Sequence, residues 1–257
     1  MKILTLLQAR TSSTRLPAKV LKDLLGQPMI VRQIQRVQRA KNIGSLCLVT
    51  STDASDDILA ETVRCAGIMV FRGSLNDVLD RFYQAAYPFV PDVLIRLTGD
   101  CPLIDPQIID RAVEMFQQES CDYLSNSIQT TYPDGMDVEV FSFHALEYAW
   151  RNALLPSERE HVTSYIYKHP KQFKLCNLSN NVDLSSIRLT VDEPEDFILV
   201  EKIYKELFKN NSDFLLSDII KVLQENPNWV DLNQNITRNA GYLKSILQDS
   251  LIEKGVQ

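Results

Sequence analysis

The sequence predicts an α/β protein with a mostly parallel sheet, and two observations lead to this fold class. In the first half of the 257 residues, short apolar runs of strand length alternate with longer segments of helical periodicity. Strands that alternate with helices of this size are typical of parallel sheets, whose crossover connections are almost always right-handed. The composition, with 45% apolar and 23% charged residues, is that of an ordinary globular protein with a substantial core.

Strands and helices alternate regularly in the first half of the chain. The first predicted strand is the buried run 3–7, and a polar loop follows it. Pro28 suits the first turn of a helix, and Ile30, Ile34 and Val37 then form one apolar stripe. The remaining strands of this half are predicted at 46–50, 68–71 and 92–97, and the helices at 28–40, 53–66, 75–86 and 106–118.

The rhythm changes after Cys121. Strands are predicted at 123–127, 136–141, 173–178 and 187–191, and helices at 143–152, 156–168, 194–208 and 215–224. The tail from Asn226 is polar and weakly patterned, and the chain contains no internal repeat and no flexible linker. We therefore predict one α/β domain over 1–210, with a substrate or dimer element at about 123–180, and a C-terminal helical extension over 211–257.

Composition excludes several classes of protein. The net charge of −6 argues against a general nucleic-acid binder, although one cationic pocket for a small anion can exist on an acidic protein. The five cysteines never form a CxxC pair, so no zinc site or disulfide framework is predicted. No apolar run approaches the roughly 18 residues of a membrane span, and the apolar N-terminal run is too short for a signal peptide. We expect a reduced cytoplasmic protein.

Ligands of open α/β sheets bind outside the carboxyl ends of the strands, and this rule places 8–19, 51–53 and 98–102 on one rim. The segment 8–19 holds three cations, Arg10, Arg15 and Lys19, together with four hydroxyl side chains. Backbone N–H groups, hydroxyls and cations of this kind suit the oxygens of a nucleoside triphosphate. The segment is neither a Walker A loop nor a GxGxxG motif, and the alternative is a solvated polar loop.

Two aspartates are candidates for a metal site. Asp100 follows the predicted strand 92–97 on the same rim, where a carboxylate and phosphate oxygens together suit Mg²⁺. Its alternative role is to cap the turn that contains Pro102. Asp192 precedes a helix that starts at Pro194, and a simple helix cap is an alternative for this residue as well.

Two further polar clusters could contact a polar substrate. Asp137 and Glu139 lie on one face of a predicted strand, and Glu160 and His161 lie near the start of a predicted helix. The alternative for each cluster is a solvated face or a cap. The other two histidines of the chain, at positions 144 and 169, have no such neighbours and are interpreted as structural.

The motifs together resemble those of the SpsF-like branch of the cytidylyltransferase family, which is related to the synthetases of CMP-sialic acids and CMP-KDO. The resemblance is carried by QARxxSxRLPxK at 8–19, GDCP at 99–102 and VDxPED at 191–196. Supporting similarity covers 73–81, 134–140, 158–163 and the tail 235–245, with its Arg-Asn-x-Gly-Tyr-x-Lys-Ser pattern. The middle region differs from that of the sialate and KDO enzymes, so the acceptor is not inherited.

The resemblance implies a Rossmann-like, three-layer α/β/α nucleotidyltransferase fold of GT-A-like topology, a homodimer, and the use of CTP with Mg²⁺. Arg10, Lys19 and Asp100 would be catalytic, and Asp100 and Asp192 would hold the metal. The implied nucleotide-binding residues are Leu7, Ala9, Arg10, Ser13, Arg15, Lys19, Ser51, Gly73, Asp77 and Thr98. The implied acceptor-binding residues are Asp137, Glu139, Glu160, His161 and Arg188.

The predicted activity is transfer of CMP from CTP to a sugar acid or another small anionic or polyol acceptor. One alternative is a glycosyltransferase of similar topology that uses a nucleotide sugar. Such enzymes typically hold their metal with an Asp-x-Asp motif, which occurs nowhere in the sequence. A second alternative is a non-catalytic nucleotide-binding protein.

Overall fold

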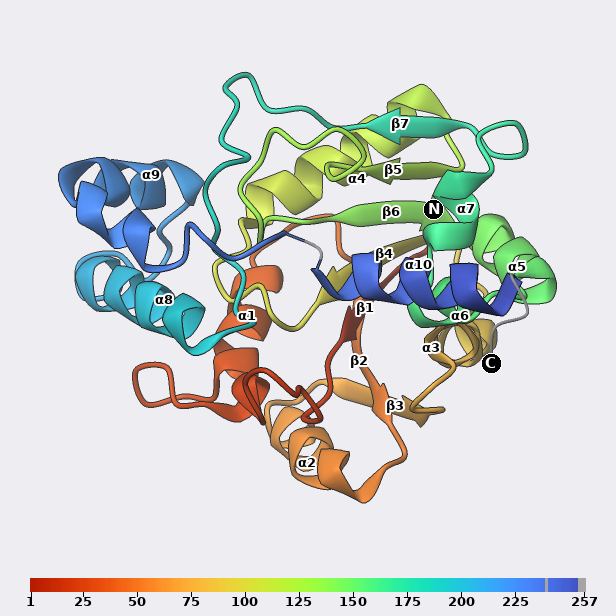
Figure 1. The fold of residues 1–257 in the computed structure, drawn as a ribbon, viewed down its shortest axis with the longest axis horizontal. Helices are drawn as coiled ribbons and strands as arrows, with labels where there is room; N and C mark the ends of the chain where they lie inside the picture. Colours follow the sequence, from red (N-terminus) through yellow and green to blue (C-terminus); the bar gives the residue numbers. More distant parts are fainter. Residues whose placement is uncertain (239, 254–257) are drawn as a thin grey trace.

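A seven-stranded sheet organises the chain, and the computed structural model describes residues 1–238 and 240–253. The strands are β1 (Ile3–Gln8), β2 (Ser45–Ser51), β3 (Met69–Gly73), β4 (Val93–Thr98), β5 (Tyr123–Ser125), β6 (Glu139–Ser142) and β7 (Leu175–Asn177). Their order in the sheet is β3-β2-β1-β4-β6-β5-β7, with β3 and β7 at opposite edges (Figure 1). Only β6 runs antiparallel to its neighbours β4 and β5, so the predicted mostly parallel α/β sheet is confirmed.

Helices lie on both faces of the sheet. The α-helices are α1 (Met29–Val37), α2 (Asp57–Cys65), α3 (Val78–Ala86), α4 (Pro106–Glu119), α5 (Phe143–Asn152), α6 (Pro156–Glu160), α7 (Ser164–Lys168), α8 (Pro194–Leu207), α9 (Leu216–Glu225) and α10 (Ala240–Glu253). Short 3₁₀ helices are η1 (Lys19–Leu21), η2 (Ala54–Asp56), η3 (Tyr87–Phe89) and η4 (Pro227–Leu232). None of the helices in the described part of the chain is long and apolar enough to cross a membrane.

The alternation of side chains along β1 produces two hydrophobic cores. Leu4 and Leu6 face a core shared with α3, α5 and α7, whereas Leu7 faces the larger core shared with α1, α2, α4, α8 and α9. Side chains of α9 such as Ile219 are fully buried in that larger core. Both faces of the sheet are therefore covered, and the rims at the strand ends remain open for a ligand.

The register of the central strands fixes the geometry of one rim. Gln8 at the end of β1 pairs with Thr98 at the end of β4, and with Val49 near the end of β2. The loops that follow these three parallel strands therefore leave the sheet side by side. The segments that the sequence analysis placed on one rim do lie there.

The predicted strand at 187–191 is wrong. This segment is extended, but its backbone pairs with loops rather than with a strand of the sheet. Leu189 N donates to Asp134 O at 2.7 Å, and Val191 N donates to Asp100 O at 2.8 Å. Gly135 permits this approach, because it has φ +100° and a Cβ there would lie 2.5 Å from Thr190 N. The segment therefore joins the rim of the site instead of extending the sheet.

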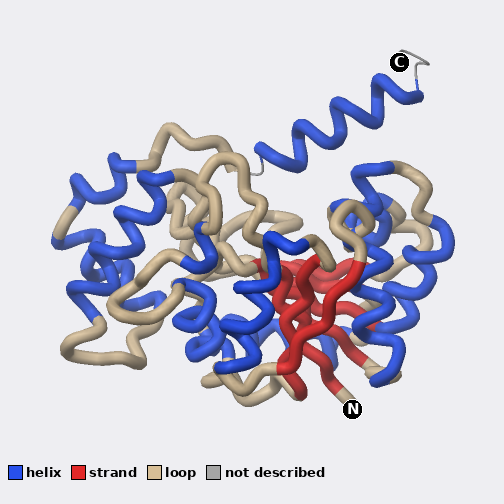
Figure 2. The backbone as a smooth tube through the Cα atoms, turned by 90° about the horizontal axis from the view of Figure 1, so that it is seen from below, coloured by secondary structure: helices blue, strands red, loops and turns tan. Residues whose placement is uncertain are grey.

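Two other helical predictions need correction. The predicted helix 156–168 is two short helices, α6 and α7, because Val162 between them has a left-handed backbone with φ +52°. The tail that looked weakly patterned contains η4 and the helix α10. Figure 2 shows α10 standing apart from the sheet, on the side away from the N-terminus.

Candidate active site

A cavity of about 690 Å³ opens at the carboxyl ends of β1 and β4. Its lining comes from the end of β1 and the loop after it, from β4 and the segment after it, from Val78 of α3, and from several segments of the second half of the chain. The predicted site residues in its lining are Ala9, Arg10, Ser13, Arg15, Lys19, Thr98, Asp100, Asp137, Glu139, Glu160, His161 and Asp192. The structure brings these residues together, and their individual roles stay predictions.

Buried Asp56 holds the loop after β1 in place. Its Oδ1 atom accepts hydrogen bonds from the backbone N–H of Thr11 at 2.7 Å and from the Thr11 hydroxyl at 2.8 Å. Its Oδ2 atom accepts from the backbone N–H of Ser51 at 3.2 Å. One carboxylate without exposed surface thus ties the cationic loop to the end of β2. The sequence analysis placed Asp56 only within the predicted helix 53–66 and missed this role.

The loop after β4 approaches the loop after β1 closely. Gly99 N donates to Gln8 O at 2.7 Å. A Cβ on Gly99 would lie only 2.7 Å from the Cβ of Ala9, so a larger residue at 99 would push the two loops apart. This contact sets the position of Asp100 relative to the cations of the first loop.

Lys19 joins the two predicted metal-binding aspartates. Its Nζ atom lies 2.8 Å from Asp192 Oδ1 and 3.4 Å from Asp100 Oδ2, and it also donates to Val191 O at 2.7 Å. The two carboxylates come from separate loops, yet they converge on the ammonium group of one lysine, a residue that is 8% exposed. The spacing of the motifs in the sequence could not establish this meeting point.

The pKa values of Lys19 and Asp192 are shifted by their mutual contact. Burial lowers the pKa of Lys19, but the charges of Asp100 and Asp192 outweigh burial and raise it above its ordinary value. Burial raises the pKa of Asp192, but Lys19, Arg15 and Arg188 outweigh burial and hold it below its ordinary value. Both groups are therefore charged at neutral pH.

The other two cations of the loop differ in their partners. Arg15 pairs with Asp192 at 3.0 Å and with Glu193 at 3.3 Å. Arg10 is exposed, lines the cavity, and has no ion pair with any residue in the described ranges 1–238 and 240–253. A free guanidinium inside a cavity is suited to phosphate oxygens.

The donor set at this point fits Mg²⁺ and does not fit a metal held by protein groups alone. Within the described residues, no group of three or more His, Cys, Asp or Glu side chains could hold an ion. Asp100 and Asp192 supply carboxylate oxygens that both lie within 3.4 Å of one atom of the cationic loop, Lys19 Nζ. Mg²⁺ typically uses one or two carboxylates together with phosphate oxygens and water.

The opposite side of the cavity is built around Arg96 of β4. Its guanidinium pairs with Glu139 and donates to Gln8 Oε1 at 3.0 Å. Glu139 also accepts from the hydroxyls of Tyr123, at 2.7 Å, and Thr163. Glu139 thus lies in the cavity, but most of its hydrogen-bonding capacity is used by the protein.

The remaining predicted acceptor residues of this side contact the C-terminal tail. Asp137 accepts from Arg238 Nη2 at 2.6 Å, and burial raises the pKa of Asp137 to about 7 even though Arg238 lowers it. His161 Nε2 lies 3.0 Å from Ser245 Oγ, and Glu160 accepts from the same hydroxyl at 2.9 Å. Burial lowers the pKa of His161 and outweighs the opposite effect of Glu160.

Four predicted nucleotide-binding residues do not line the cavity. Leu7 and Ser51 are fully buried in the sheet, and Gly73 lies at the end of β3, where a Cβ would be 2.9 Å from the Cγ of Arg81. Asp77 caps α3 by accepting from Asp80 N at 2.9 Å, and its carboxylate pairs with Arg159 at 2.6 Å. That these four residues bind a nucleotide stays a prediction, and their position outside the cavity lining does not favour it.

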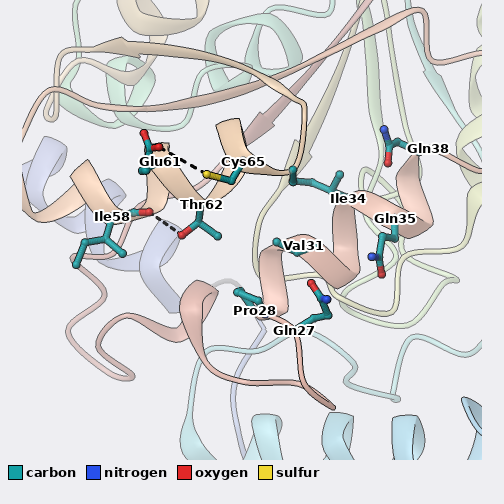
Figure 3. A pocket seen from close by; sticks show the side chains of 11 residues that line it. Gln27, Pro28, Val31, Ile34, Gln35, Gln38, Ile58, Glu61, Thr62 and Cys65 are labelled. Carbon is teal, nitrogen blue, oxygen red and sulfur yellow. Dashed lines mark hydrogen bonds between the residues drawn. The ribbon is translucent and has the colours of Figure 1, made fainter.

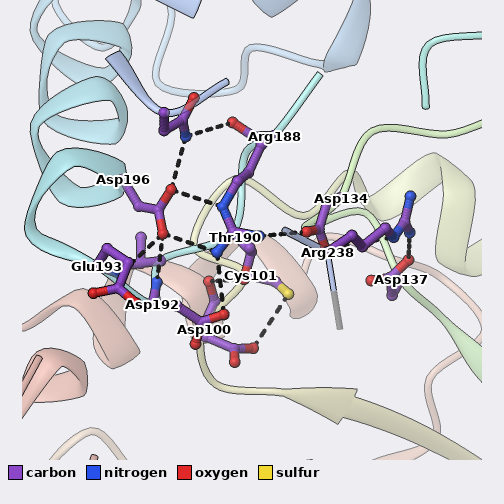
Figure 4. Close-up of polar contacts among 12 residues, drawn as sticks. Asp100, Cys101, Asp134, Asp137, Arg188, Thr190, Asp192, Glu193, Asp196 and Arg238 are labelled. Atoms are coloured by element: carbon purple, nitrogen blue, oxygen red, sulfur yellow. Dashed lines mark hydrogen bonds and ion pairs between the residues drawn. The ribbon is translucent and has the colours of Figure 1, made fainter. Parts of the chain in front are cut away.

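Arg188, the fifth predicted residue outside the cavity, forms a buried ion network (Figure 4). Its guanidinium contacts Asp196 at 2.9 Å, Asp134 at 2.7 Å and Asp192 at 3.2 Å. Its side chain is 6% exposed. The geometry thus favours a structural role, which orients Asp192, over contact with an acceptor.

Sequence reasoning missed several lining residues. Arg96 was hidden in a predicted strand, although a charge in the middle of a central parallel strand is itself unusual. Asp134 and Thr163 were quoted only as parts of longer motifs, and Tyr242 only as part of the tail. These residues are separated along the chain, and only the tertiary structure brings them to the cavity.

A second hollow of about 710 Å³ lies between α1 and α2 (Figure 3). Apolar side chains such as Val31, Ile34 and Ile58 form much of its wall, and glutamines and Glu61 supply polar groups. It is similar in volume to the first cavity, but its lining contains no cation and only one carboxylate. Its chemistry does not suit a triphosphate, so we assign the candidate site to the rim of the sheet.

Comparison with known proteins identifies the family of the chain. The sequence model of the cytidylyltransferase family matches residues 4–241, which include all of the loops described above. The chain belongs to the cytidylyltransferase family. The resemblance on which the sequence analysis relied is thereby confirmed.

Two relatives support the family assignment, and a third protein shares the fold. The chain is 34% identical to the spore coat polysaccharide biosynthesis protein SpsF of Bacillus subtilis, over 88% of this chain and 95% of SpsF. It is 34% identical to a cytidylyltransferase of known structure from Leptospira borgpetersenii, with a TM-score of 0.86 over 93% of this chain and 99% of the other. A CMP-2-keto-3-deoxy-manno-octonic acid synthetase complexed with CTP shares the fold, at 17% identity and a TM-score of 0.63 over 80% of this chain and 100% of the synthetase.

Proposed function

We propose that the protein transfers CMP from CTP to a sugar acid or a related small anionic or polyol acceptor and releases pyrophosphate. The observation that carries the proposal is the convergence of Asp100 and Asp192 on Lys19, in the cavity that the exposed Arg10 also lines. Support comes from the CTP in the related synthetase structure and from the name of SpsF, which concerns spore coat polysaccharide. A role in the synthesis of surface glycan precursors is consistent with both.

In this reaction an acceptor oxygen attacks the α-phosphorus of CTP, and pyrophosphate leaves in line. Such transfers depend mainly on positioning and on stabilisation of charge. Arg10, Arg15 and Lys19 would hold the oxygens of the leaving pyrophosphate, where negative charge accumulates. The lining on the Arg96 side, with its hydroxyls and carboxylates, would orient the acceptor.

Asp100 and Asp192 would hold Mg²⁺. When bound, the ion supplies positive charge to the triphosphate and polarises oxygens next to the α-phosphorus. Lys19 would then need to move from between the carboxylates toward the phosphates, because its ammonium group and a cation compete for the same oxygens. The manganese in a mycobacterial structure of the same fold, at 17% identity, is consistent with a divalent ion. Homodimer formation and a cytoplasmic location stay predictions.

The test of the proposed function is pyrophosphate release. The full-length protein is incubated with Mg²⁺, with each of CTP, UTP, ATP and GTP, and with a panel of acceptors: sugar acids, sugar phosphates, polyol phosphates and phosphonates. We expect release with CTP and an acceptor, because the family model and the CTP-bound relative agree on this nucleotide. Release that requires a nucleotide sugar would favour a glycosyltransferase, and no release from any combination would favour a non-catalytic binding protein.

Replacing Arg10 with alanine should weaken binding of CTP without lowering stability. Arg10 is exposed and unpaired within the described chain, so its removal leaves no buried group without a partner. Loss of one charged hydrogen bond to phosphate should weaken affinity by about tenfold or more. Calorimetric titration with CTP and Mg²⁺ measures this, and thermal unfolding measures stability. Arg151→Ala, an exposed arginine of α5, is the control and should change neither quantity.

A further inference from the structure

The role of the C-terminal helix α10 is not explained by the site described so far. The helix lies beyond the carboxyl ends of the central strands, where Figure 2 shows it crossing above the sheet. Two of its residues, Gly241 and Tyr242, line the same cavity as Arg10 and Asp100. The described residues of the two preceding α-helices, α8 and α9, do not contribute to this lining. It therefore forms a wall of the site.

Polar contacts hold α10 and the residue before it against the predicted acceptor residues and α6. Just before the helix, Arg238 binds Asp137 at 2.6 Å. One turn into the helix, Ser245 Oγ contacts His161 and Glu160. Asp249 then accepts from the backbone N–H of Ser157, at the start of α6, at 3.2 Å.

Tyr242 is the part of the wall that faces the acceptor side. Its ring meets the ring of His161 edge-on with 4.9 Å between centroids, and the ring of Tyr167 with 6.3 Å. All three rings line the cavity. By contrast Leu243, the next residue along α10, is 51% exposed and does not line the cavity. One side of α10 thus faces the site and another faces solvent.

We propose that α10 closes the acceptor end of the active site, and that Tyr242 determines which acceptors fit and excludes water from the reacting phosphate. The inference rests on the proposed function, because it assigns an acceptor to this end of the cavity. Aromatic rings beside hydroxyls and carboxylates form a surface that suits the C–H faces and hydroxyl groups of a sugar-like molecule. A closed wall also prevents water from taking the place of the acceptor oxygen.

The test compares three full-length variants with the wild type: Tyr242→Ala, Tyr242→Phe and Leu243→Ala. Affinity for CTP with Mg²⁺ is measured by calorimetry. Pyrophosphate release is measured with 2-keto-3-deoxy-manno-octonic acid as the probe acceptor, and with water alone, where CTP and water give CMP and pyrophosphate. These measurements separate nucleotide binding, acceptor binding and exclusion of water.

In Tyr242→Ala we expect KM for the probe to rise by about tenfold or more, because a pocket contact is lost. Hydrolysis of CTP by water should increase relative to transfer, and affinity for CTP should stay within about twofold. Tyr242→Phe keeps the ring but loses the contact of its hydroxyl with Tyr167, so it should restore most of what Tyr242→Ala loses. Leu243→Ala should behave like the wild type. If the probe is not an acceptor, the comparison of hydrolysis rates decides alone.

The inference is overturned if Tyr242→Ala changes neither KM nor hydrolysis, or if it weakens binding of CTP and acceptor equally, as a loss of folded protein would. Failure of the proposed function looks different. In that case the wild type itself binds no CTP or releases no pyrophosphate with any acceptor or with water, and the inference fails with it.

Discussion

We expect Asp100→Asn to lower the rate of CMP transfer by about 10²- to 10³-fold or more, as for removal of a group that stabilises charge in the transition state. The substitution keeps the size of the side chain and removes its negative charge. A neutral amide binds Mg²⁺ weakly, and Asp192 alone would then hold the ion. The rate is measured as pyrophosphate release, and affinity for Mg²⁺ is measured by calorimetry with CTP present.

The fold should persist in this variant. The contacts of Asp100 with 187–191 use its backbone oxygen, which accepts from Val191 N at 2.8 Å and from the Thr190 hydroxyl at 3.2 Å. Lys19 keeps its closer partner Asp192 at 2.8 Å. Asp92→Asn is a matched control, because Asp92 lies just before the opposite end of β4 and is exposed. Normal turnover by Asp100→Asn would show that the metal assignment is wrong.

The second large effect is expected on stability, from Arg188→Met. Methionine fills similar space but leaves buried Asp196 without its cation, and it leaves Asp134 only the more distant Arg238, at 3.8 Å. Breaking a buried ion pair by removing one partner costs about 3–5 kcal/mol, a large part of the net stability of a typical protein. For a chain of this size we expect a decrease in Tm of about 10 °C. Thermal and urea unfolding measure the loss.

The stability lost in Arg188→Met should depend on pH. Burial raises the pKa of Asp196, but Arg188 and the backbone N–H groups of Asp192 and Glu193 outweigh burial and lower it below its ordinary value. Asp196 therefore contributes stability above its unfolded pKa of about 4, and this contribution is lost as pH falls through the lower folded value. The difference between variant and wild type should consequently shrink below about pH 4.

Arg64→Met is the control for this measurement, because Arg64 is exposed and its pair with Glu61, at 3.9 Å, is exposed as well, so its removal should cost less than about 1 kcal/mol. The experiment also decides between two roles for Arg188. A variant with unchanged stability and a raised KM for the acceptor would contradict the structural role and restore the original prediction from the resemblance.

Features of the site that depend on residues contiguous in the chain could be predicted from the sequence. The β1 loop was predictable because its cations and hydroxyls are contiguous in the chain and follow a strand whose direction the alternation of elements establishes. The position of Asp100 on the same rim was predictable because this residue also follows a predicted strand. The positions of these residues on a common rim follow from the register of Gln8 with Thr98, which the rule for parallel sheets anticipates.

Other features depend on contacts between residues that are far apart in the sequence, and no short sequence pattern indicates such contacts. The extended segment 187–191 has the composition of a strand, but its partners are the backbones of loops at Asp134 and Asp100, so only one isolated bridge forms. Arg188 was assigned to the acceptor side by the resemblance to the family. Its carboxylate partners Asp134 and Asp196 come from other elements, and they convert it into a structural cation.

The position of Lys19 has a consequence for the order in which the protein acquires function during its synthesis. Its two carboxylate partners follow it by 81 and 173 residues along the chain. Domains form progressively from the N-terminus as the ribosome extends the chain, so β1 to β4 can assemble while Asp192 is still unsynthesised. A nascent chain in that state has the cationic loop but neither the second carboxylate nor the wall supplied by α10. The site of the proposed reaction is therefore assembled only after Asp192 and α10 have been synthesised, and we expect products truncated before Asp192 not to transfer CMP.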